Sequence, residues 1–354
     1  MAIYATGRDA MPYKGVMDDI RACVALKRPK RIPVFAMSEE FDVKWYGKYT
    51  YEETIQSADK LVEVWSAAVR EFDYDWVWLQ IDDCIEFEVL GVGCVGEGNI
   101  LRATHDYLPA ARETLKSLKM PDPSSDGRMP IKLEALRRFK AEFGDTVCVA
   151  GSNAAPYSSA GLLYGLETPM LMMYEDPGLL RDTMDFFVDL QSRWSVAQIK
   201  AGADVIWLGD CNAFSGLLSP AHYRKFAAEP CRKVIQACQK AGGMVFLHNS
   251  EISIPHIELE IELKPDVVSV GPGADMEAAL RAARGRMCIM GNVDPIEVLM
   301  KGTPEQVEQD VDRLMAIGRQ GTGFMLDSGE MIPRDVPVEN MRAFMRRGHQ
   351  LAVP

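Results

Sequence analysis

The amino-acid sequence lacks any apolar run approaching the roughly 18 residues that a membrane-spanning helix requires. Its first residues, MAIYATGRDAMPYKG, carry charges and lack the apolar stretch of about 7 to 15 residues found in secretion signals. We therefore expect a cytoplasmic protein with neither a membrane span nor an export signal.

Positive charge is also scarce. The 354 residues include 39 lysines and arginines against 51 aspartates and glutamates, a formal net charge of −12. Proteins that bind nucleic acid need a basic face to release counterions from phosphates, so this balance argues against general nucleic-acid binding. A polyanionic ligand would need a local basic pocket.

The signatures of several enzyme classes are missing as well. The eight cysteines show no C-x-x-C spacing, and we expect them to be reduced thiols. There is no G-x-S-x-G elbow, no P-loop, no H-E-x-x-H and no dinucleotide glycine fingerprint. With 47% hydrophobic and 25% charged residues, the composition is that of an ordinary soluble globular chain.

What the sequence does contain is a regular alternation of short apolar runs with longer amphipathic segments. Helices are predicted between the runs, for example over 54–72, 177–201, 220–241 and 304–318. The eight runs expected to be strands are 32–37, 76–81, 147–151, 205–208, 244–248, 267–269, 287–291 and 323–326. Eight such units favour a (β/α)8 TIM barrel in the α/β class, with an open doubly wound sheet as the alternative.

The spacing of these elements predicts the domain organisation. Residues 1–30 are expected to form an N-terminal helical extension, and residues 31–354 a single TIM-barrel domain. The gap between the second and third strands is too long for a simple crossover. We therefore expect residues 83–146 to form a long insertion with helices over 107–118 and 132–143.

Chemistry in a TIM barrel takes place at the C-terminal ends of the strands, so the residues that follow each run are the candidates. They are unusually rich in carboxylates, with a single imidazole at His248. Crowded carboxylates indicate a divalent metal or a general acid–base site. Each also has an ordinary interpretation, because Asp82 or Asp83 could cap a helix and His248 could be a core histidine.

Four stretches of the chain are similar to a known family. They read GDCNAFSGLLSPAHYRKFAAEP, AGGMVFLHNS, IMGNVDPIEVLMKGTPEQVEQDV and GFMLDSGEMIPRDVPVENMRAF. The order GNVDP, GTPEQV, P-x-E-N resembles the uroporphyrinogen decarboxylase superfamily, and more closely its branch of corrinoid-dependent methyltransferases. The resemblance spans roughly residues 32–344 and implies a TIM barrel.

Two departures from the family pattern bear on function. Decarboxylases of the family bind a porphyrinogen through an arginine-rich N-terminal segment, whereas the corresponding stretch here is PVFAMSEEFDVKWYGK. The thiol-methylating branch holds zinc with a His-x-Cys motif and a later cysteine, and here those positions are His248, Ser250 and Glu330. The expected metal, Zn²⁺ or another divalent ion, would be held by His248, Glu330 and Asp210. The alternative is that the metal has been lost.

The resemblance extends to the methyltransferase I component of anaerobic ether-cleaving O-demethylases. We therefore expect transfer of a methyl group from a small methoxylated aromatic substrate to cobalamin carried by a separate corrinoid protein. Asp83, Glu39 and Asp210 are the expected catalytic residues. The expected substrate-binding residues are Met37, Trp45, Tyr46, Asn153 and Tyr157.

Two rival functions remain open at this level. One is a decarboxylase of a small carboxylic acid, in which Asp82 or Asp83 protonates a carbanion. The other is a non-catalytic module that binds a corrinoid protein or another ligand. The sequence is compatible with a homo-oligomer and does not determine its size.

Overall fold

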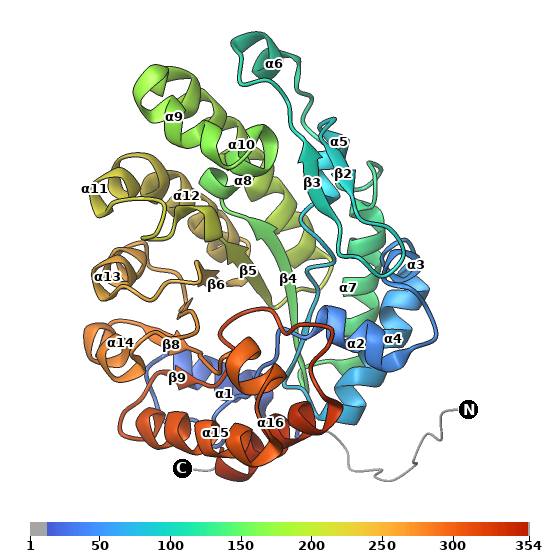
Figure 1. The fold of residues 1–354 in the computed structure, drawn as a ribbon, viewed down its shortest axis with the longest axis vertical. Helices are drawn as coiled ribbons and strands as arrows, with labels where there is room; N and C mark the ends of the chain where they lie inside the picture. The colour runs from blue at the N-terminus through green and yellow to red at the C-terminus, as the bar shows by residue number, and fades with distance from the viewer. Residues whose placement is uncertain (1–12, 353–354) are drawn as a thin grey trace.

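The computed structural model describes residues 13–352 and contains a curled, parallel, seven-stranded sheet surrounded by helices (Figure 1). The strand order is β1-β4-β5-β6-β7-β8-β9. These strands are β1 (Trp76–Trp78), β4 (Cys148–Ala154), β5 (Val205–Gly209), β6 (Met244–His248), β7 (Val267–Ser269), β8 (Cys288–Met290) and β9 (Phe324–Met325). The arrangement agrees with the predicted (β/α)8 barrel class.

Helices precede, connect and follow these strands. They are α1 (Val16–Val24), α2 (Glu39–Tyr46), α3 (Tyr51–Ile55), α4 (Ala58–Phe72), α5 (Ile85–Val89), α6 (Arg112–Ser117), α7 (Met129–Phe143), α8 (Pro156–Tyr164), α9 (Glu167–Glu175), α10 (Pro177–Lys200), α11 (Pro220–His222), α12 (Ala228–Lys240), α13 (Ile254–Glu262), α14 (Met276–Ala283), α15 (Pro304–Gly318) and α16 (Val338–Leu351). Shorter 3₁₀ and π turns cover Cys211–Ala213, Tyr223–Ala227 and Pro295–Met300.

The structure differs from the prediction at 32–37, which is not a regular strand. Its only ladder pairing among the described residues is an isolated parallel bridge between Val34 and Leu326. On the other side, towards β1, side chains replace the ladder: Val34 N donates to Asp75 Oδ2 at 2.8 Å, and Trp76 Nε1 donates to Ala36 O at 2.8 Å. The segment therefore lies between β9 and β1, with few backbone bonds of its own.

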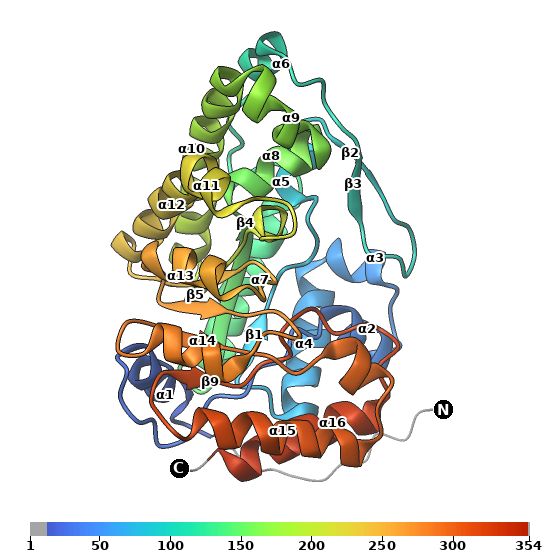
Figure 2. The same ribbon diagram turned by 60° about the vertical axis from the view of Figure 1, so that its left-hand side comes forward.

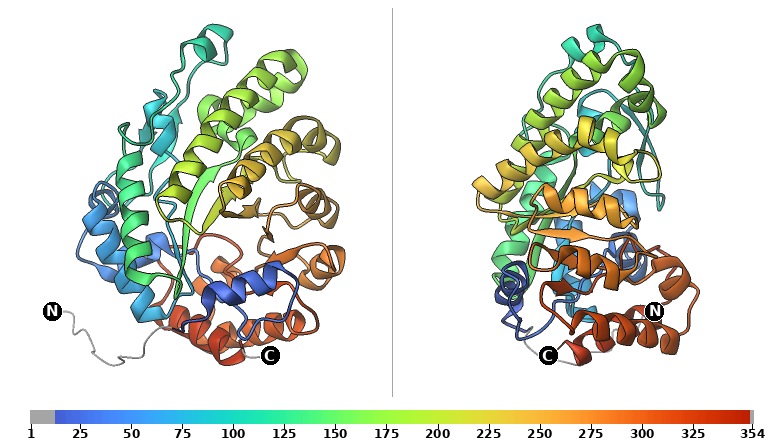
Figure 3. Two further views of the ribbon diagram at one scale, coloured as in Figure 1. Left: turned by 180° about the vertical axis from the view of Figure 1, so that it is seen from behind. Right: turned by 90° about the vertical axis from the view of Figure 1, so that its left-hand side faces the viewer.

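The interior of the barrel is filled by alternate residues of the strands. Inward-facing residues of the lower layers include Trp76, Cys148, Val205, Val267 and Cys288, each the first residue of its strand. These pack with Val16, Met17, Ile20 and Cys23 of α1. Helix α1 therefore covers the N-terminal end of the barrel, as the view from behind shows (Figure 3).

Residues 85–143, between β1 and β4, contain α5, a two-stranded hairpin of β2 (Gly93–Val95) and β3 (Ala103–Asp106), α6 and α7. The hairpin runs along one side of the molecule to α3 (Figure 2). At its tip, Gly98 N donates to Glu52 Oε2 and Asn99 O accepts from Arg334. Of the expected N-terminal extension, α1 is seen, and residues 1–12 lie outside the described part of the chain.

The helix boundaries follow local capping chemistry. Thr303 begins α15 with a capping box, because its hydroxyl accepts from Gln306 N while the Gln306 side chain accepts from Thr303 N. The predicted helix 54–72 is instead two helices, because the Ser57 hydroxyl accepts from Lys60 N and starts α4 anew. The predicted helix 107–118 is limited to α6.

Candidate active site

A pocket opens above the inner layer of the barrel, at the C-terminal ends of the strands. Its volume is about 140 Å³. Its lining residues are Met37, Trp78, Gln80, Asp82, Asp83, Glu86, Phe87, Lys132, Ser152, Asn153, Ala154, Ser158, Leu162, Trp207, Gly209, Cys211, Asn212, His248, Glu330 and Met331. The floor comes from the strand alternation, because Trp78, Ser152, Trp207 and His248 continue the inward-facing series of β1, β4, β5 and β6.

One end of the pocket is built around the buried imidazole of His248, the last residue of β6. His248 Nε2 lies 3.2 Å from Glu330 Oε2 and 3.2 Å from Ser250 Oγ, and Ser250 Oγ donates to the same carboxylate. Nδ1 of the ring lies 3.1 Å from Ser269 Oγ on β7. The ring also stacks on Trp207, with 4.7 Å between centroids. The imidazole is therefore fixed by contacts on both nitrogens and on one face.

The electrostatics of this pair favour an imidazolium beside a carboxylate. Burial alone would lower the pKa of His248, but the Glu330 carboxylate and the neighbouring Cys211 sulfur raise it well above its ordinary value. Burial likewise opposes ionisation of Glu330, yet the charge of His248 lowers the pKa of that carboxyl to about 2. The pair is thus a proton donor with a counter-ion beside it.

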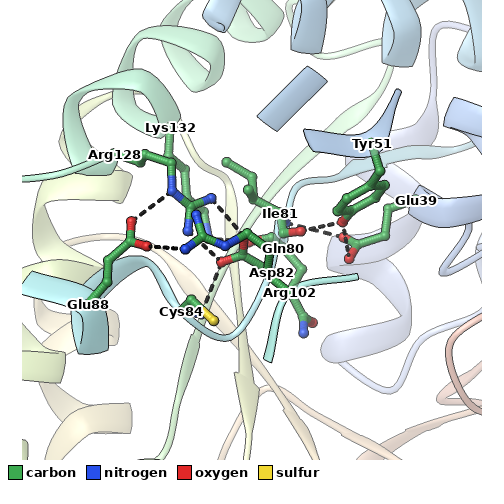
Figure 4. Close-up of polar contacts among 10 residues, drawn as sticks. All are labelled: Glu39, Tyr51, Gln80, Ile81, Asp82, Cys84, Glu88, Arg102, Arg128 and Lys132. Carbon is green, nitrogen blue, oxygen red and sulfur yellow. Dashed lines mark hydrogen bonds and ion pairs between the residues drawn. The ribbon is translucent and has the colours of Figure 1, made fainter. Parts of the chain in front are cut away.

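The opposite end of the pocket holds carboxylates and two buried cations (Figure 4). The Arg128 guanidinium binds both carboxylate oxygens of Asp82, at 2.7 and 3.0 Å, and Glu88 at 2.8 Å. Lys132 Nζ donates to Gln80 O, Ser152 O and Ser152 Oγ at 2.8–3.2 Å. All three Lys132 protons are therefore used within the protein, and the residue balances charge rather than presenting a free donor.

Asp83 and Glu86 carry the carboxyl oxygens that remain open to a ligand. Asp83 Oδ1 accepts from Gln80 Nε2 at 2.9 Å, and Glu86 Oε1 accepts from Gln191 Nε2 at 3.0 Å. The pKa of Asp83 is raised to about 6, first by desolvation and then by the charges of Asp82 and Glu86. Near neutral pH this carboxyl can therefore exchange a proton with a bound group.

The expected site residues fall into three groups. Met37, Asp83, Asn153, His248 and Glu330 line the pocket. Of these, Asn153 has its amide committed to the protein, since Nδ2 donates to Gln191 Oε1 at 2.9 Å and Oδ1 accepts from the Ser195 hydroxyl.

Glu39, Asp210 and Tyr157 lie behind the pocket lining. Glu39 is buried, and its carboxyl oxygens accept from the Tyr51 hydroxyl and from Ile81 N at 3.1 and 3.2 Å, so it holds the loop after β1 (Figure 4). Burial raises the pKa of Glu39 to about 8 and that of Asp210 to about 7. Tyr157 on α8 is buried.

The prediction that Trp45 and Tyr46 bind substrate is corrected by the structure, because neither residue lines the pocket. Trp45 packs its ring on Phe72 of α4, with 5.1 Å between centroids. The Tyr46 hydroxyl donates to Glu63 Oε1 at 2.6 Å. Both residues stand at the C-terminal end of α2, on the side that packs against α4, so they support the helix layer instead of a substrate.

The expected metal ligands do not assemble. Asp210 Oδ1 accepts from Ser158 Oγ at 2.9 Å, and only its backbone N–H reaches the His248 strand, at the carbonyl oxygen. A catalytic zinc site uses three protein ligands. Within residues 13–352, no three His, Cys, Asp or Glu side chains gather as metal ligands would. The donor set therefore does not fit the expected metal.

Several lining residues were not selected from the sequence. Lys132 was missed because it belongs to an amphipathic helix, where a lysine ordinarily faces solvent. Strand alternation indicates Trp78 and Trp207, since they lie two residues before Gln80 and Gly209, and both of those also line the pocket. Cys211 follows Asp210 directly, but only the fold brings it to His248 and Ser250.

Comparisons with known proteins are consistent with this architecture. No helix of the described chain is both long and apolar enough to cross a membrane. The sequence is 26% identical over 314 residues to a uroporphyrinogen decarboxylase of Psychromonas ingrahamii, which covers 84% of this chain and 85% of the relative. A second uroporphyrinogen decarboxylase, from Shewanella pealeana, is 25% identical over 92% of this chain and 95% of its own length.

Among solved structures, a methyltransferase from Methanosarcina mazei superposes with a TM-score of 0.84 at 19% identity, over 95% of this chain and 98% of that one. A B12-independent methionine synthase from Shewanella sp. W3-18-1 gives a TM-score of 0.58 at 10% identity, over 85% and 88%. At these identities the similarity establishes the fold. The sequence model of uroporphyrinogen decarboxylase (URO-D) matches residues 17–351. The chain therefore belongs to the uroporphyrinogen decarboxylase family.

Proposed function

We propose that the protein is a methyltransferase that moves a methyl group from a methoxylated aromatic ring to the cobalt of a separate corrinoid protein. The observation that carries this proposal is the pairing of the buried His248 with the half-buried Glu330, at one end of a pocket walled by Trp78 and Trp207. The fold shared with the Methanosarcina mazei methyltransferase supports the same reaction class.

The size and charge of the pocket favour a single ring over a tetrapyrrole. A cavity of about 150 Å³ is large enough to bind benzene, and this pocket measures about 140 Å³. Four of its lining side chains are carboxylates, those of Asp82, Asp83, Glu86 and Glu330. A porphyrinogen with many carboxylates would be repelled by them, because its charges have the same sign.

The chemistry needs help at the leaving oxygen. Phenoxide is a poor leaving group, so a proton delivered to the ether oxygen as the bond to the methyl carbon breaks lowers the barrier. His248 supplies that proton from Nε2, Glu330 stabilises the imidazolium beforehand, and the methyl carbon bonds to cobalt(I) on the partner. Asp83 accepts a hydrogen bond from a ring hydroxyl, and Glu39 holds the loop that carries Asp83. No step is assigned to a metal.

The test is methyl transfer from a guaiacol-type ether to free cob(I)alamin, followed by its absorbance. We expect His248→Ala and Glu330→Ala each to lower the rate by about a hundredfold or more, the usual contribution of a general acid. His222→Ala, which removes a half-buried imidazole on α11 that does not line the pocket, should leave the rate unchanged. Full activity in both site variants would overturn the assignment.

A decarboxylase of a small carboxylic acid is the second candidate. It is favoured by the Asp83 carboxyl, whose pKa of about 6 suits protonation of a carbanion near neutrality, and by the decarboxylase relatives. In that case Asp83→Asn should abolish release of carbon dioxide from the substrate acid, while Glu330→Ala retains it.

A further inference from the structure

Two carboxyl groups at one end of the pocket have an oxygen to spare. Asp83 and Glu86 are three residues apart around the start of α5, and both line the pocket. Gln80 Nε2 donates to Asp83 Oδ1, and Gln191 Nε2 donates to Glu86 Oε1. Within residues 13–352, the second oxygen of each carboxyl accepts no side-chain hydrogen bond. A ligand can therefore bond to both residues.

Glu86 is the more enclosed of the two. Only 5% of the residue is exposed, and burial is the main cause that raises the pKa of its carboxyl. A buried carboxylate is costly unless a cation or several hydrogen bonds compensate it. The one side chain that donates to Glu86 is the neutral amide of Gln191. Glu86 is therefore a buried acid without a bonded positive partner among the described residues.

The charges that line the pocket do not balance. Its carboxylates and cations are Asp82, Asp83, Glu86 and Glu330 on one side, and Lys132 and His248 on the other. Arg128 lies outside the lining and neutralises Asp82. His248 neutralises Glu330. Among the described lining residues, Lys132 alone is then left to face both Asp83 and Glu86. A ligand with one positive charge would complete the balance.

The cations that line the pocket are also committed elsewhere. Lys132 donates its three protons to two backbone oxygens and to Ser152 Oγ. The ring nitrogens of His248 lie 3.1 Å from Ser269 Oγ and 3.2 Å from Glu330 Oε2. A ligand carboxylate at the Asp83 end would therefore meet negative charge, with no uncommitted cation to receive it.

The walls of the pocket suit a flat ring that carries positive charge. Trp78, Phe87 and Trp207 line the pocket, and the Trp78 and Trp207 rings meet edge to face with 5.9 Å between centroids. Aromatic side chains pack against other rings and attract ammonium groups to their faces. Phe87 directly follows Glu86 in the sequence. An aromatic ammonium ion therefore matches both the walls and the charge of this pocket.

We propose that the Asp83–Glu86 end of the pocket binds a protonated amine, so that the preferred substrate is a methoxylated ring that carries an ammonium group. Glu86 determines this specificity, because its carboxylate pairs with the ammonium. Asp83 accepts a further hydrogen bond from the same group, which has three protons where a hydroxyl has one. The methyl ether rests on the proposed function, whereas the preference for positive charge rests on the pocket alone.

The experiment measures binding, without any corrinoid, of three ligands of similar shape. They are 3-methoxybenzylamine, 3-methoxybenzyl alcohol and 3-methoxybenzoate, and isothermal titration calorimetry at pH 7 gives each dissociation constant. We expect the amine to bind about tenfold or more tightly than the alcohol, the gain typical of a charge-assisted hydrogen bond. The benzoate should bind more weakly than the alcohol. Glu86→Gln should remove the advantage of the amine and leave the affinity for the alcohol unchanged.

Glu134→Gln is the matched control, because Glu134 is exposed on α7 and does not line the pocket. It should keep the wild-type order of the three ligands. Asp83→Asn provides a second test, and should reduce the advantage of the amine even if Glu86→Gln does not fold. An amine that binds no better than the alcohol, or a Glu86→Gln protein that weakens all three ligands equally, would overturn the proposal.

The same ligands separate this inference from the proposed function. A benzoate that binds as tightly as the amine would overturn the charge preference and favour the decarboxylase. A charge preference without methyl transfer to cob(I)alamin would leave the ammonium subsite standing and defeat the proposed function. Methyl transfer without a charge preference would do the reverse.

Discussion

At the scale of single residues, the balance between burial and charge decides what each carboxyl of the pocket can do. Glu330 faces the His248 cation, so its pKa is lowered and it stays ionised, whereas Asp83 faces Asp82 and Glu86 and holds its proton to a higher pH. The same residue type therefore serves as a counter-ion at one end and as a proton carrier at the other.

This balance predicts the behaviour of Glu330→Gln. Removing the charge leaves burial as the main influence on His248, so its pKa should fall and the proton donor should be lost at lower pH. We expect methyl transfer to drop about a hundredfold near pH 7, and the alkaline limb of the rate profile to move to lower pH. Glu277→Gln on the exposed face of α14 is the control. An unchanged alkaline limb would contradict the role given to Glu330.

The sequence predicts the site residues at the C-terminal ends of the strands, but it does not predict the buried cation on the opposite side of the pocket. His248 and Glu330 could be predicted because His248 ends one predicted strand, Glu330 follows another, and both occupy positions of the family's zinc motif. Lys132 could not, since its identity as a buried cation depends on the backbone oxygens of Gln80 and Ser152 that the fold brings to it. The aromatic rings of Trp45 and Tyr46 suggest a substrate pocket, but in the structure both side chains contact helix α4 instead.

At the scale of elements, apolar runs were a good guide to strands and a poor guide to how strands are bonded. Seven of the eight predicted strands form the sheet. The remaining one, 32–37, lies where a strand is expected but forms no backbone ladder with β1. The Asp75 carboxylate and the Trp76 indole bond to its backbone groups instead. An apolar run shows where a segment is buried, and it carries no information about side chains of a neighbouring strand.

Helix α1 offers a test at this scale. Ile20 is fully buried against the lower layer of the barrel interior, so Ile20→Ala should cost about 2 to 5 kcal/mol of the free energy of unfolding. Urea denaturation followed by circular dichroism measures the cost. Arg21→Ala on the exposed face of the same helix should change stability by less than about 0.5 kcal/mol. Equal effects of the two substitutions would show that α1 does not seal the barrel.

At the scale of the whole molecule, buried acids set the dependence of stability on pH. Burial raises the pKa of Glu39 and Asp42 to about 8, and of Asp210 and Asp327 to about 7. The folded chain then binds more protons than the unfolded chain above about pH 4, so stability falls as pH rises through these values. Lys132, with its pKa lowered to about 8, acts in the opposite direction above that pH.

The melting temperature should therefore decline between about pH 6 and pH 8. Asp327→Asn should flatten the decline, because burial is the largest influence on this carboxyl and raises its pKa to about 7. Asp335→Asn, at an exposed ion pair with Lys44, should leave the slope unchanged. Differential scanning calorimetry across this range measures the slope, and a melting temperature that rises with pH would contradict the burial argument.

The closure of the barrel at its N-terminal end has a consequence for how ligands enter and leave. Because α1 covers the N-terminal end of the strands, a small molecule must arrive and depart through the same opening at the other end. That single opening would have to admit the ether, release the phenol and receive the corrinoid protein, one after another. Slow dissociation of the product would then limit the rate of turnover, however fast the carbon–oxygen bond breaks.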